Sequence, residues 1–295
     1  MASFPCFLNA KMLIMILFKR SEDLHHWVLE QKNKGKITGF VPTMGALHEG
    51  HMELVKACRS MVDQTICSIF VNPAQFNDPK DFEKYPVSTE KDIQMLYHAG
   101  ADIVFLPSVE EIYPHGQTGL ETYDLGPLET LLEGRYRPGH FQGVSQVMSR
   151  LLTLVQPDHL FMGQKDFQQC LVVQRLIEIM HLPVQLHTVP TVREEDGLAQ
   201  SSRNRRLTAE QRKNAAAISQ VLSDIRGKLS SGDAGELLKQ AREKLDAAHF
   251  KTDYISIARA SDLQPLADWN GKEKAVALVA AFQGDVRLID NMLLN

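Results

Sequence analysis

The sequence predicts an α/β fold: a Rossmann-like parallel sheet followed by a smaller C-terminal α+β domain. In the first two-thirds of the chain, short apolar and β-branched runs alternate with longer helical patterns. The runs lack polar alternation, as strands do in a parallel sheet that is covered on both faces. After about Val192, two amphipathic helices are followed by further strands. We therefore predict a first domain of residues 1–191 and a second domain of residues 192–295.

Size and composition agree with two packed domains. The chain has 295 residues, of which 44% are hydrophobic and 23% are charged, so it can form a full core. Its formal net charge of -4 argues against a nucleic-acid partner, because such proteins usually carry a basic excess. The four cysteines lack CxxC spacing, which favours reduced cytosolic thiols over a zinc site or disulfides. They are Cys6, Cys58, Cys67 and Cys170.

The N-terminal apolar run from Met12 to Phe18 is too short to span a bilayer and has no small-residue cleavage site. Lys19 and Arg20 follow it, whereas a secretory signal carries its positive charge mainly in front. We interpret this run as the first buried strand, with the residues before Lys11 forming a loose extension. We therefore expect a cytoplasmic protein with no membrane partner.

The elements of the first domain follow in order along the chain. The predicted strands are Leu13–Phe18, Ile37–Val41, Thr65–Val71, Ile103–Leu106, His159–Phe161 and Val184–Val189. The clearest helix follows Gly143, since apolar residues recur there at three-and-four spacing. Its buried face is predicted to contain Val144, Val147, Met148, Leu151, Leu152 and Val155. Ser108 and Glu111 have the spacing of a capping box that opens a short helix.

The second domain is predicted to start with a long helix near Thr208. Thr208 and Gln211 have capping-box spacing, and an apolar stripe runs from Ala215 to Leu229. A break at residues 230–233 separates it from a second helix, which carries Leu237, Leu238, Ala241 and Leu245. The predicted strands that follow are Tyr254–Ala258, Ala275–Phe282 and Arg287–Ile289.

The segment from Phe40 to His51 contains a strand end, a turn and the start of a helix. His48 and His51 are three residues apart at that start, so both rings lie on one side, beside unpaired backbone N–H groups and the positive end of the helix dipole. This is a phosphate site, and Gly50 permits a ring or phosphate to approach the backbone. A lone histidine here could simply cap the helix. The strand–turn–HxGH–helix context instead indicates an adenylyl-transferring fold.

Two later segments could complete a nucleotide site. Residues 197–206 are polar and basic, and their hydroxyls and arginines can hold the β- and γ-phosphates. Residues 163–166 end a strand, and Lys165 offers a point charge for phosphate while Asp166 could cap a helix or meet a ribose hydroxyl. Each segment taken alone could also be an ordinary linker or turn.

Residues 71–77 and 134–141 supply further polar groups. The first segment follows a strand, so Asn72 and Gln75 lie at the same rim and can bind hydroxyls or carboxylate oxygens without charge. The second segment brings Arg137 and His140 in front of the Gly143 helix. An ordinary Asn-Pro turn and an exposed basic loop are the structural alternatives.

Together these segments resemble the pantothenate synthetase (pantoate–β-alanine ligase) family of the HxGH nucleotidyltransferase superfamily. The resemblance runs from about Met12 to the C-terminus and is most specific before residue 206. The matching motifs are PTMGALHEGH, FVNPAQFN, KYP, GRYRPGHFQGV, GQKDFQQ and PTVREEDGLAQSSRN. The reaction that this family implies begins with ATP and (R)-pantoate, which give pantoyl-adenylate and pyrophosphate. β-Alanine then attacks, releasing pantothenate and AMP.

The resemblance also implies residue roles. His48 and His51 would contact the ATP phosphates, with His51 donating a proton, and Gln75 and Gln169 would bind the pantoate hydroxyls. The implied nucleotide-binding residues are Met44, Gly45, Ala46, Leu47, His48, Glu49, Gly50, His51, Gly163, Gln164, Lys165, Asp166, Val192, Gln200, Ser201, Ser202 and Arg203. Asn72, Tyr85, Arg137 and His140 would complete the substrate environment. The family uses Mg²⁺ with ATP, whose protein ligands stay unassigned, and it implies a homodimer.

Two positions depart from the family pattern: Gln164 stands where Glu is common, and Gln200 where Met is common. Both bear on adenine and ribose recognition rather than on the reaction.

A reactive adenylate needs protection from water, so we expect the second domain or residues 75–85 to act as a lid. The alternatives are an adenylyltransferase of the same superfamily acting on a phosphorylated substrate, an RNA-binding remnant of a tRNA synthetase, and a nucleotide sensor without catalysis.

Overall fold

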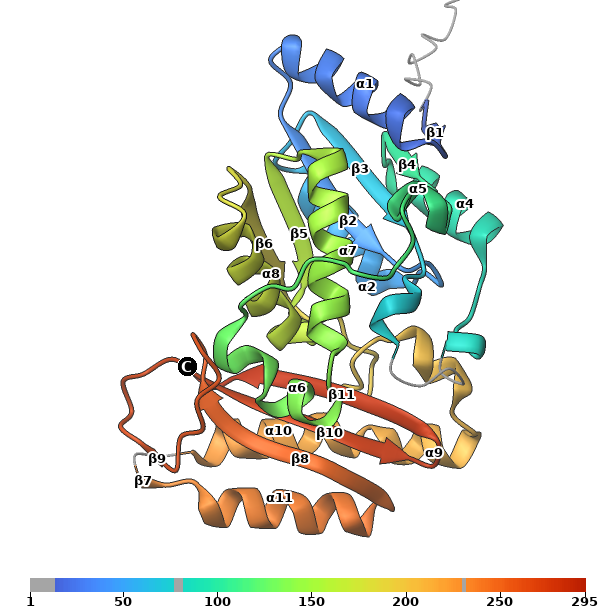
Figure 1. Cartoon of the computed structure of the whole chain (residues 1–295). Helices are drawn as coiled ribbons and strands as arrows, with labels where there is room; N and C mark the ends of the chain where they lie inside the picture. The colour runs from blue at the N-terminus through green and yellow to red at the C-terminus, as the bar shows by residue number, and fades with distance from the viewer. Residues whose placement is uncertain (1–13, 77–81, 230–231) are drawn as a thin grey trace, which may run out of the picture.

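Six parallel strands form the sheet of the first domain in the computed structural model, which describes residues 14–76, 82–229 and 232–295. The strands are β1 (Ile16–Phe18), β2 (Thr38–Thr43), β3 (Gln64–Ile69), β4 (Ile103–Phe105), β5 (His159–Gly163) and β6 (Gln185–Val189). Their order is β1-β4-β3-β2-β5-β6, and every adjacent pair is parallel (Figure 1). All six predicted strands are present, with ends shifted by at most three residues. The first strand was predicted to be buried, and this is wrong: Ile16 and Leu17 are exposed, because β1 lies at the edge of the sheet. Leu13 and Cys6 lie outside the described residues.

Helices α1 (Ser21–Asn33), α2 (Glu49–Arg59), α4 (Thr89–Ala99), α7 (His140–Val155) and α8 (Phe167–Ile179) cover both faces of this sheet, as predicted. The shorter helical elements of the domain are η1 (Pro73–Gln75), α5 (Val109–Ile112), η2 (Gly126–Glu129), α6 (Leu132–Tyr136) and η3 (Gln164–Asp166). One core joins α1, α7 and α8 to one face through Phe40, and another joins α2 and α4 to the other face through Val41. The two residues are adjacent in β2 and point in opposite directions.

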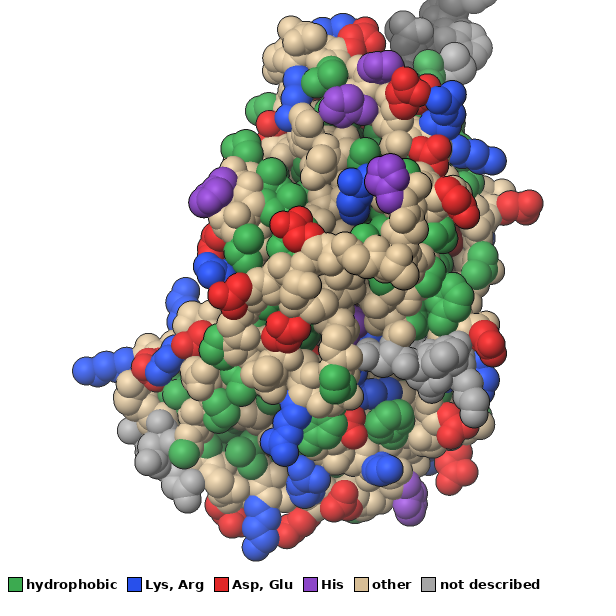
Figure 2. Space-filling view, viewed as in Figure 1, with side chains coloured by type: hydrophobic (Ala, Val, Ile, Leu, Met, Phe, Trp, Pro, Cys, Tyr) green, Lys and Arg blue, Asp and Glu red, His purple; other side chains and the backbone are tan. Residues whose placement is uncertain are grey.

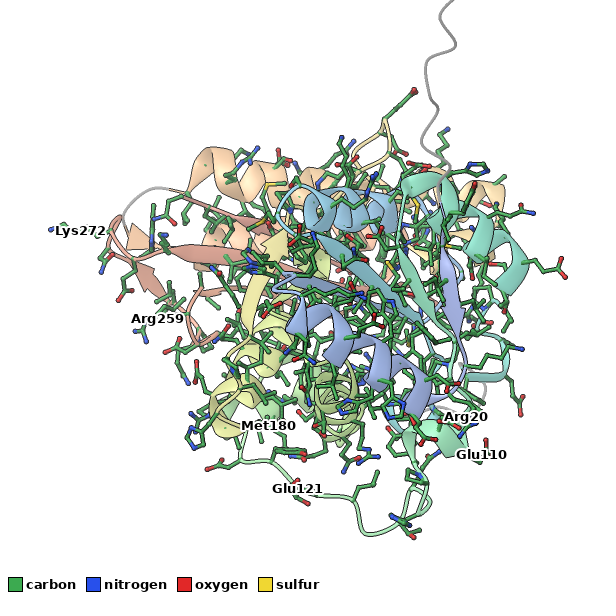
Figure 3. The ribbon with its side chains drawn as sticks, turned by 90° about the horizontal axis from the view of Figure 1, so that it is seen from above. Arg20, Glu110, Glu121, Met180, Arg259 and Lys272 are labelled. Atoms are coloured by element: carbon green, nitrogen blue, oxygen red, sulfur yellow. The ribbon has the colours of Figure 1, made fainter. Side chains whose placement is uncertain are left out.

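The predicted capping box at α5 forms only in part. The Ser108 side chain accepts a hydrogen bond from the Glu111 backbone N–H. The Glu111 carboxylate instead accepts from the backbone N–H and hydroxyl of Ser21, each at 2.7 Å, at the start of α1. Figure 3 labels the neighbouring Arg20 and Glu110 at this junction. Glu111 therefore caps a different helix, because tertiary packing offers it two donors at once.

The strand order places a crevice between β2 and β5. The chain leaves β2 toward β3 and β4, whereas β5 and β6 lie on the opposite side of β2. Ligands of open α/β sheets bind at such a switch point, beyond the carboxyl ends of the strands. The HxGH segment directly follows β2, and residues 164–166 directly follow β5. Two of the predicted nucleotide segments therefore meet at this crevice.

The second domain is α+β, as predicted. Its elements are η4 (Ser202–Arg206), α9 (Ala209–Ala215), α10 (Ala217–Lys228), β7 (Gly232–Asp233), α11 (Gly235–Ala247), β8 (Phe250–Arg259), β9 (Asp268–Trp269), β10 (Ala275–Gln283) and β11 (Val286–Leu293). The Thr208–Gln211 capping box forms. The single long helix predicted after it is instead two helices, although Ala216 between them keeps right-handed helical angles. The short β7–β9 pair was not predicted.

The three long strands of the second domain form an antiparallel sheet in the order β11-β10-β8, which lies between the first domain and helices α10 and α11 (Figure 1). Apolar contacts join the domains directly, since buried Tyr254 and Leu278 pack with Leu131 and Phe167. Acidic and basic side chains are interspersed over the face in Figure 2. Within the described residues, none of the helices is both long and apolar enough to cross a membrane.

Candidate functional site

A cavity of about 220 Å³ lies at the carboxyl ends of β2 and β5. Most residues that the sequence proposed for the site line it together: Met44, His48, Gly50, His51, Asn72, Gln75, Tyr85, Gly163, Lys165, Asp166, Gln169, Val192, Gln200, Ser201, Ser202 and Arg203. The other proposed residues do not line it: Gly45, Ala46, Leu47, Glu49, Gln164, Arg137 and His140. A larger cleft of about 740 Å³ between the domains shares Lys165, Asp166, Ser201 and Arg203 with this cavity. The convergence of His51 and Arg203 gives one ligand access to both.

The two histidines of the HxGH segment cap helix α2 with their rings. The Gly50 N–H donates to Nδ1 of His48 at 3.2 Å, and the His48 N–H donates to Nδ1 of His51 at 3.3 Å. The ring centroids are 4.1 Å apart. A Cβ on Gly50 would lie 2.9 Å from Cε1 of His48, so only glycine lets that ring lie so close to the backbone.

These bonds fix the protonation of both rings. Each Nδ1 accepts a hydrogen bond, so a neutral ring carries its proton on Nε2. Burial, helped by Lys165 and Arg205, lowers the pKa of His48 to about 4. Burial, helped by His48 and Lys165, lowers the pKa of His51 to about 3. At neutral pH, both rings are therefore uncharged donors through Nε2.

Acid should destabilise the fold through these rings. An unfolded histidine takes up a proton below a pKa of about 6.5, whereas the folded rings resist protonation until about pH 4 or 3. The free energy of unfolding should therefore fall as the pH drops from about 6.5 toward 4. For one ring with the pKa of His48, the loss at pH 5 is about 2 kcal/mol. Urea unfolding at pH 7 and pH 5 measures it.

His48→Asn is the informative variant for this pH dependence, because Asn keeps a side-chain oxygen at the N-cap but does not titrate. Its loss of stability between pH 7 and pH 5 should be smaller than that of the wild-type chain. An unchanged loss would contradict the assignment.

Asp92 holds the turn between β2 and α2. Its carboxylate accepts from the backbone N–H groups of Ala46 and Leu47, both at 2.8 Å, and it is 1% exposed. Gly45 has φ of +78°, and a Cβ there would lie 3.0 Å from Oδ2 of Asp92. Residues 45–47 therefore contribute the shape of the turn, while Glu49 is exposed. Sequence reasoning missed Asp92 because it comes from a distant helix.

The segment that opens the second domain reaches the start of α2. Oε1 of Gln200 accepts from the Gly50 N–H at 3.0 Å, and the Arg205 guanidinium donates to the Leu47 carbonyl at 3.2 Å. The Arg203 guanidinium lies over the Tyr85 ring, 5.8 Å from its centroid. Gln200, which departs from the family pattern, thus accepts from the Gly50 N–H, a donor that a phosphate oxygen could otherwise use.

The η1 turn presents the Gln75 side chain to the cavity, where its Nε2 donates to Sδ of Met44. Asn72 fixes this turn: its Nδ2 donates to the Gly143 carbonyl at 3.2 Å, and its Oδ1 accepts from the Tyr113 hydroxyl at 2.9 Å. A Cβ on Gly143 would lie 2.3 Å from the Ala74 carbonyl oxygen, so α7 packs against η1 only through glycine.

Arg137 and His140 lie behind Gln75 rather than in this cavity, although Arg137 lines the larger cleft that adjoins it. Nδ1 of His140 donates to the Gln75 carbonyl at 2.8 Å, which leaves its Nε2 to accept from Arg137 at 3.0 Å. Burial and the neighbouring Arg137 lower the pKa of His140 to about 4, in agreement with a neutral ring. Both residues therefore hold the backbone of Gln75.

The apolar wall of the cavity was not predicted as part of the site. Val144, Val147, Met148 and Leu151 of α7 line it, with Phe70, Leu54 and Met162. The sequence assigned the α7 residues to a buried helix face, and they are buried. Hydrophobic spacing cannot distinguish a helix face that packs on a core from one that lines a buried cavity.

The described residues contain no cluster of three or more His, Cys, Asp or Glu side chains suited to hold a metal ion. Asp166 is the one carboxylate among the described residues that line the cavity. A magnesium ion carried by nucleotide phosphates needs only one or two protein carboxylates. This donor set fits an ion that arrives with ATP.

The sequence profile of the Pantoate-beta-alanine ligase family matches residues 16–293. A pantothenate synthetase from Leptospira biflexa is 43% identical over 285 residues, which cover 95% of this chain and 99% of that one. The crystal structure of the pantothenate synthetase from Thermus thermophilus is similar with a TM-score of 0.87, 42% identity, and coverage of 95% and 99%. The structure of the pantoate-beta-alanine ligase from Francisella tularensis, complexed with beta-gamma ATP and beta-alanine, is similar with a TM-score of 0.81 and 35% identity. The match covers 95% of this chain and 98% of that one.

Proposed function

This chain belongs to the pantoate–β-alanine ligase family, and we propose that its cavity between β2 and β5 joins pantoate to β-alanine at the expense of ATP. The observation that carries this proposal is the meeting of His48, His51, Lys165 and Arg203 around one cavity. Four donors from three chain segments suit a polyphosphate. The product would be pantothenate, with AMP and pyrophosphate released.

In the first step the pantoate carboxylate attacks the α-phosphate of ATP, and pyrophosphate leaves. Negative charge builds up on the α-phosphate, so donors and cations must offset it. Nε2–H of His51 and Nε2–H of His48 would donate to phosphate oxygens, with Lys165 and Arg203 supplying positive charge. The hydrogen bonds that both Nδ1 atoms accept support this, since they leave Nε2–H of each ring to donate. We assign phosphate contact to both histidines.

Pantoate would lie between the polar and apolar walls of the cavity. Gln75 and Gln169 would bind its hydroxyls, and the α7 residues would contact its two methyl groups. The presence of both glutamines with Val144, Val147 and Met148 in the cavity lining supports this placement. Asn72 and Tyr85 would close the same region.

In the second step the neutral amine of β-alanine attacks the acyl carbon of the adenylate, and AMP leaves as the bond between the acyl carbon and its oxygen breaks. The nitrogen then loses one proton to water. Asp166 is the one carboxylate among the described lining residues, so we propose that positioning, rather than a dedicated base, supplies most of the acceleration.

We also propose that the second domain (residues 192–295) shields the adenylate from water as a lid over the first domain (residues 1–191). Residues 77–81 of the alternative lid lie outside the described residues.

We propose that Mg²⁺ accompanies ATP, with Asp166 the carboxylate able to approach it. The ion would supply positive charge to the phosphate oxygens. We further propose that the protein is a cytoplasmic homodimer with no nucleic-acid partner. Sedimentation equilibrium at micromolar concentration tests the dimer.

Pyrophosphate exchange tests the proposed function. The purified chain with ATP, Mg²⁺ and labelled pyrophosphate should form labelled ATP only when pantoate is added, and β-alanine should then yield pantothenate and AMP. Exchange that does not depend on pantoate, or that requires a phosphorylated substrate instead, would count against this reaction and favour another HxGH adenylyltransferase.

Gln75→Ala should raise the KM for pantoate by about tenfold, because one hydrogen bond to a substrate hydroxyl is lost in a buried site. The KM for ATP should change little, because Gln75 lies on the pantoate side of the proposed site. The bonds that Arg137 and His140 make to the Gln75 backbone carbonyl remain available in the variant. Steady-state kinetics with each substrate varied in turn measures both values, and an unchanged pantoate KM contradicts the assignment.

A further inference from the structure

The last strand of the second domain reaches into the nucleotide site of the first. Nδ2 of Asn291, in β11, donates to the carbonyls of Gln164 at 2.8 Å and Lys165 at 2.9 Å. Its Oδ1 accepts from Nε2 of Gln164 at 3.2 Å. The side chain is 1% exposed, and both of its donor hydrogens and its oxygen are used. Asn291 thus fixes the backbone that carries Lys165.

The adjacent residue fixes a second segment of the site. The Asp290 carboxylate accepts two hydrogen bonds from the Arg193 guanidinium, at 2.6 and 3.0 Å. Arg193 also donates to the Gly197 carbonyl at 3.0 Å and to the Asn291 carbonyl at 3.2 Å. Bidentate arginine–carboxylate pairs of this kind set orientation as well as distance.

The segment that Arg193 holds leads directly to the phosphate-binding hydroxyls. Residues 193 and 199 form a β-bridge, and the Gln200 N–H donates to the Val192 carbonyl at 2.9 Å. This narrow hairpin ends at Gln200, whose side chain contacts the Gly50 N–H at the start of α2. Ser201 and Arg203 follow immediately and line the same cavity.

Two neighbouring residues therefore determine how two separate parts of the site lie relative to each other. Lys165 comes from the end of β5, and Gln200 to Arg203 come from the start of the second domain. Both parts are distant from the histidines in the sequence, so the connectivity of the chain alone does not fix their distance from His48 and His51. Small errors in such spacing are costly, since a displacement of about 1 Å can slow a reaction about 100-fold.

We propose that Asp290 and Asn291 are positioning residues for adenylate formation, holding the Lys165 turn and the Gln200–Arg203 segment at the spacing that a triphosphate requires. The inference rests on the proposed function for the identity of the reaction. Neither residue lines the cavity at the carboxyl ends of β2 and β5, although Asp290 lines the larger cleft that adjoins it. The hydrogen bonds of Asn291 end on the Gln164–Lys165 turn and those of the Asp290 carboxylate on Arg193, so we assign both residues a positioning role. On the pantoate side, Gln75 and the α7 wall come from other segments, whereas Gln169 follows the Lys165 turn in α8.

Asn291→Asp tests this directly, because it keeps the shape of the side chain and replaces two N–H donors by a carboxylate oxygen facing two carbonyls. Pantoate-dependent pyrophosphate exchange should slow by 10- to 100-fold, with the KM for ATP raised and the KM for pantoate within twofold of wild type. Aminolysis of separately supplied pantoyl-adenylate by β-alanine should stay within threefold of the wild-type rate. Asn291→Ala, which removes the donors without adding charge, should have the same pattern.

Gln283→Glu is the matched control. Gln283 is 2% exposed in the same domain, and its Nε2 donates to the Ala248 carbonyl at 3.3 Å, away from the nucleotide segments. All chains are assayed below their measured Tm. Three results would overturn the proposal. Gln283→Glu could lose as much exchange as the Asn291 variants do, both Asn291 variants could exchange at the wild-type rate, or the KM for pantoate could rise as much as the KM for ATP. Wild-type chain that exchanges without pantoate would instead overturn the proposed function.

Discussion

Replacing His51 by alanine is expected to slow pantoate-dependent pyrophosphate exchange by about 10²–10³-fold while the chain remains folded. Loss of one preorganised donor to developing phosphate charge typically has this effect on the chemical step. The ring is fixed for that purpose, because its Nδ1 accepts from the His48 N–H and its Nε2–H is left to donate. Rapid-quench measurement of adenylate formation at saturating ATP and pantoate isolates this step.

Two control variants separate donation from helix capping. His51→Asn retains a side-chain acceptor for the His48 N–H. Compared with His51→Ala, it should therefore recover more of the stability than of the rate of adenylate formation. His98→Ala removes an exposed histidine from the last turn of α4 and should leave the rate unchanged. If His51→Ala forms adenylate within threefold of the wild-type rate, the ring is a cap and nothing more.

Features that depend on local sequence were predictable. Six strands, the α7 face and the Thr208–Gln211 capping box follow from hydrophobic spacing and from side-chain to backbone bonds within one turn. The meeting of the HxGH and Gly163–Asp166 segments followed from a general rule, since parallel strands present their carboxyl ends at one edge of a sheet.

Features that depend on tertiary contact were not predictable. Asp92 caps a turn 46 residues before it, and Glu111 caps a helix start 90 residues before it. Asn291 contacts backbone 126 residues before it. Nothing in the local pattern around these residues distinguishes them from ordinary polar positions. The buried face of α7 was predicted correctly, but its place in the cavity wall was not, because the segments opposite determine whether a buried face meets a core or a cavity.

Glu133→Ala is expected to lower the free energy of unfolding by about 3–5 kcal/mol, because removing one partner of a buried ion pair leaves the other without compensation. Glu133, in α6, is 7% exposed and accepts from the Arg287 guanidinium at 2.7 and 2.8 Å and from the Tyr254 hydroxyl at 2.9 Å. Both partners come from the second domain. The variant should therefore weaken the contact between the domains as well, and urea unfolding monitored in each domain measures both effects.

The pH dependence of this variant separates charge from packing. Burial raises the pKa of Glu133, but hydrogen bonds and charge from Arg287, with Arg137, outweigh it and hold the pKa below the ordinary value. Its stabilisation is thus present above about pH 4.5 and is lost as the pH falls through the folded pKa, so the Glu133→Ala deficit should shrink in acid. Glu30→Ala, at the exposed Lys34–Glu30 pair, should cost less than about 1 kcal/mol. A Glu133→Ala deficit no larger than that of Glu30→Ala would mean that the apolar contacts, rather than this ion pair, hold the domains together.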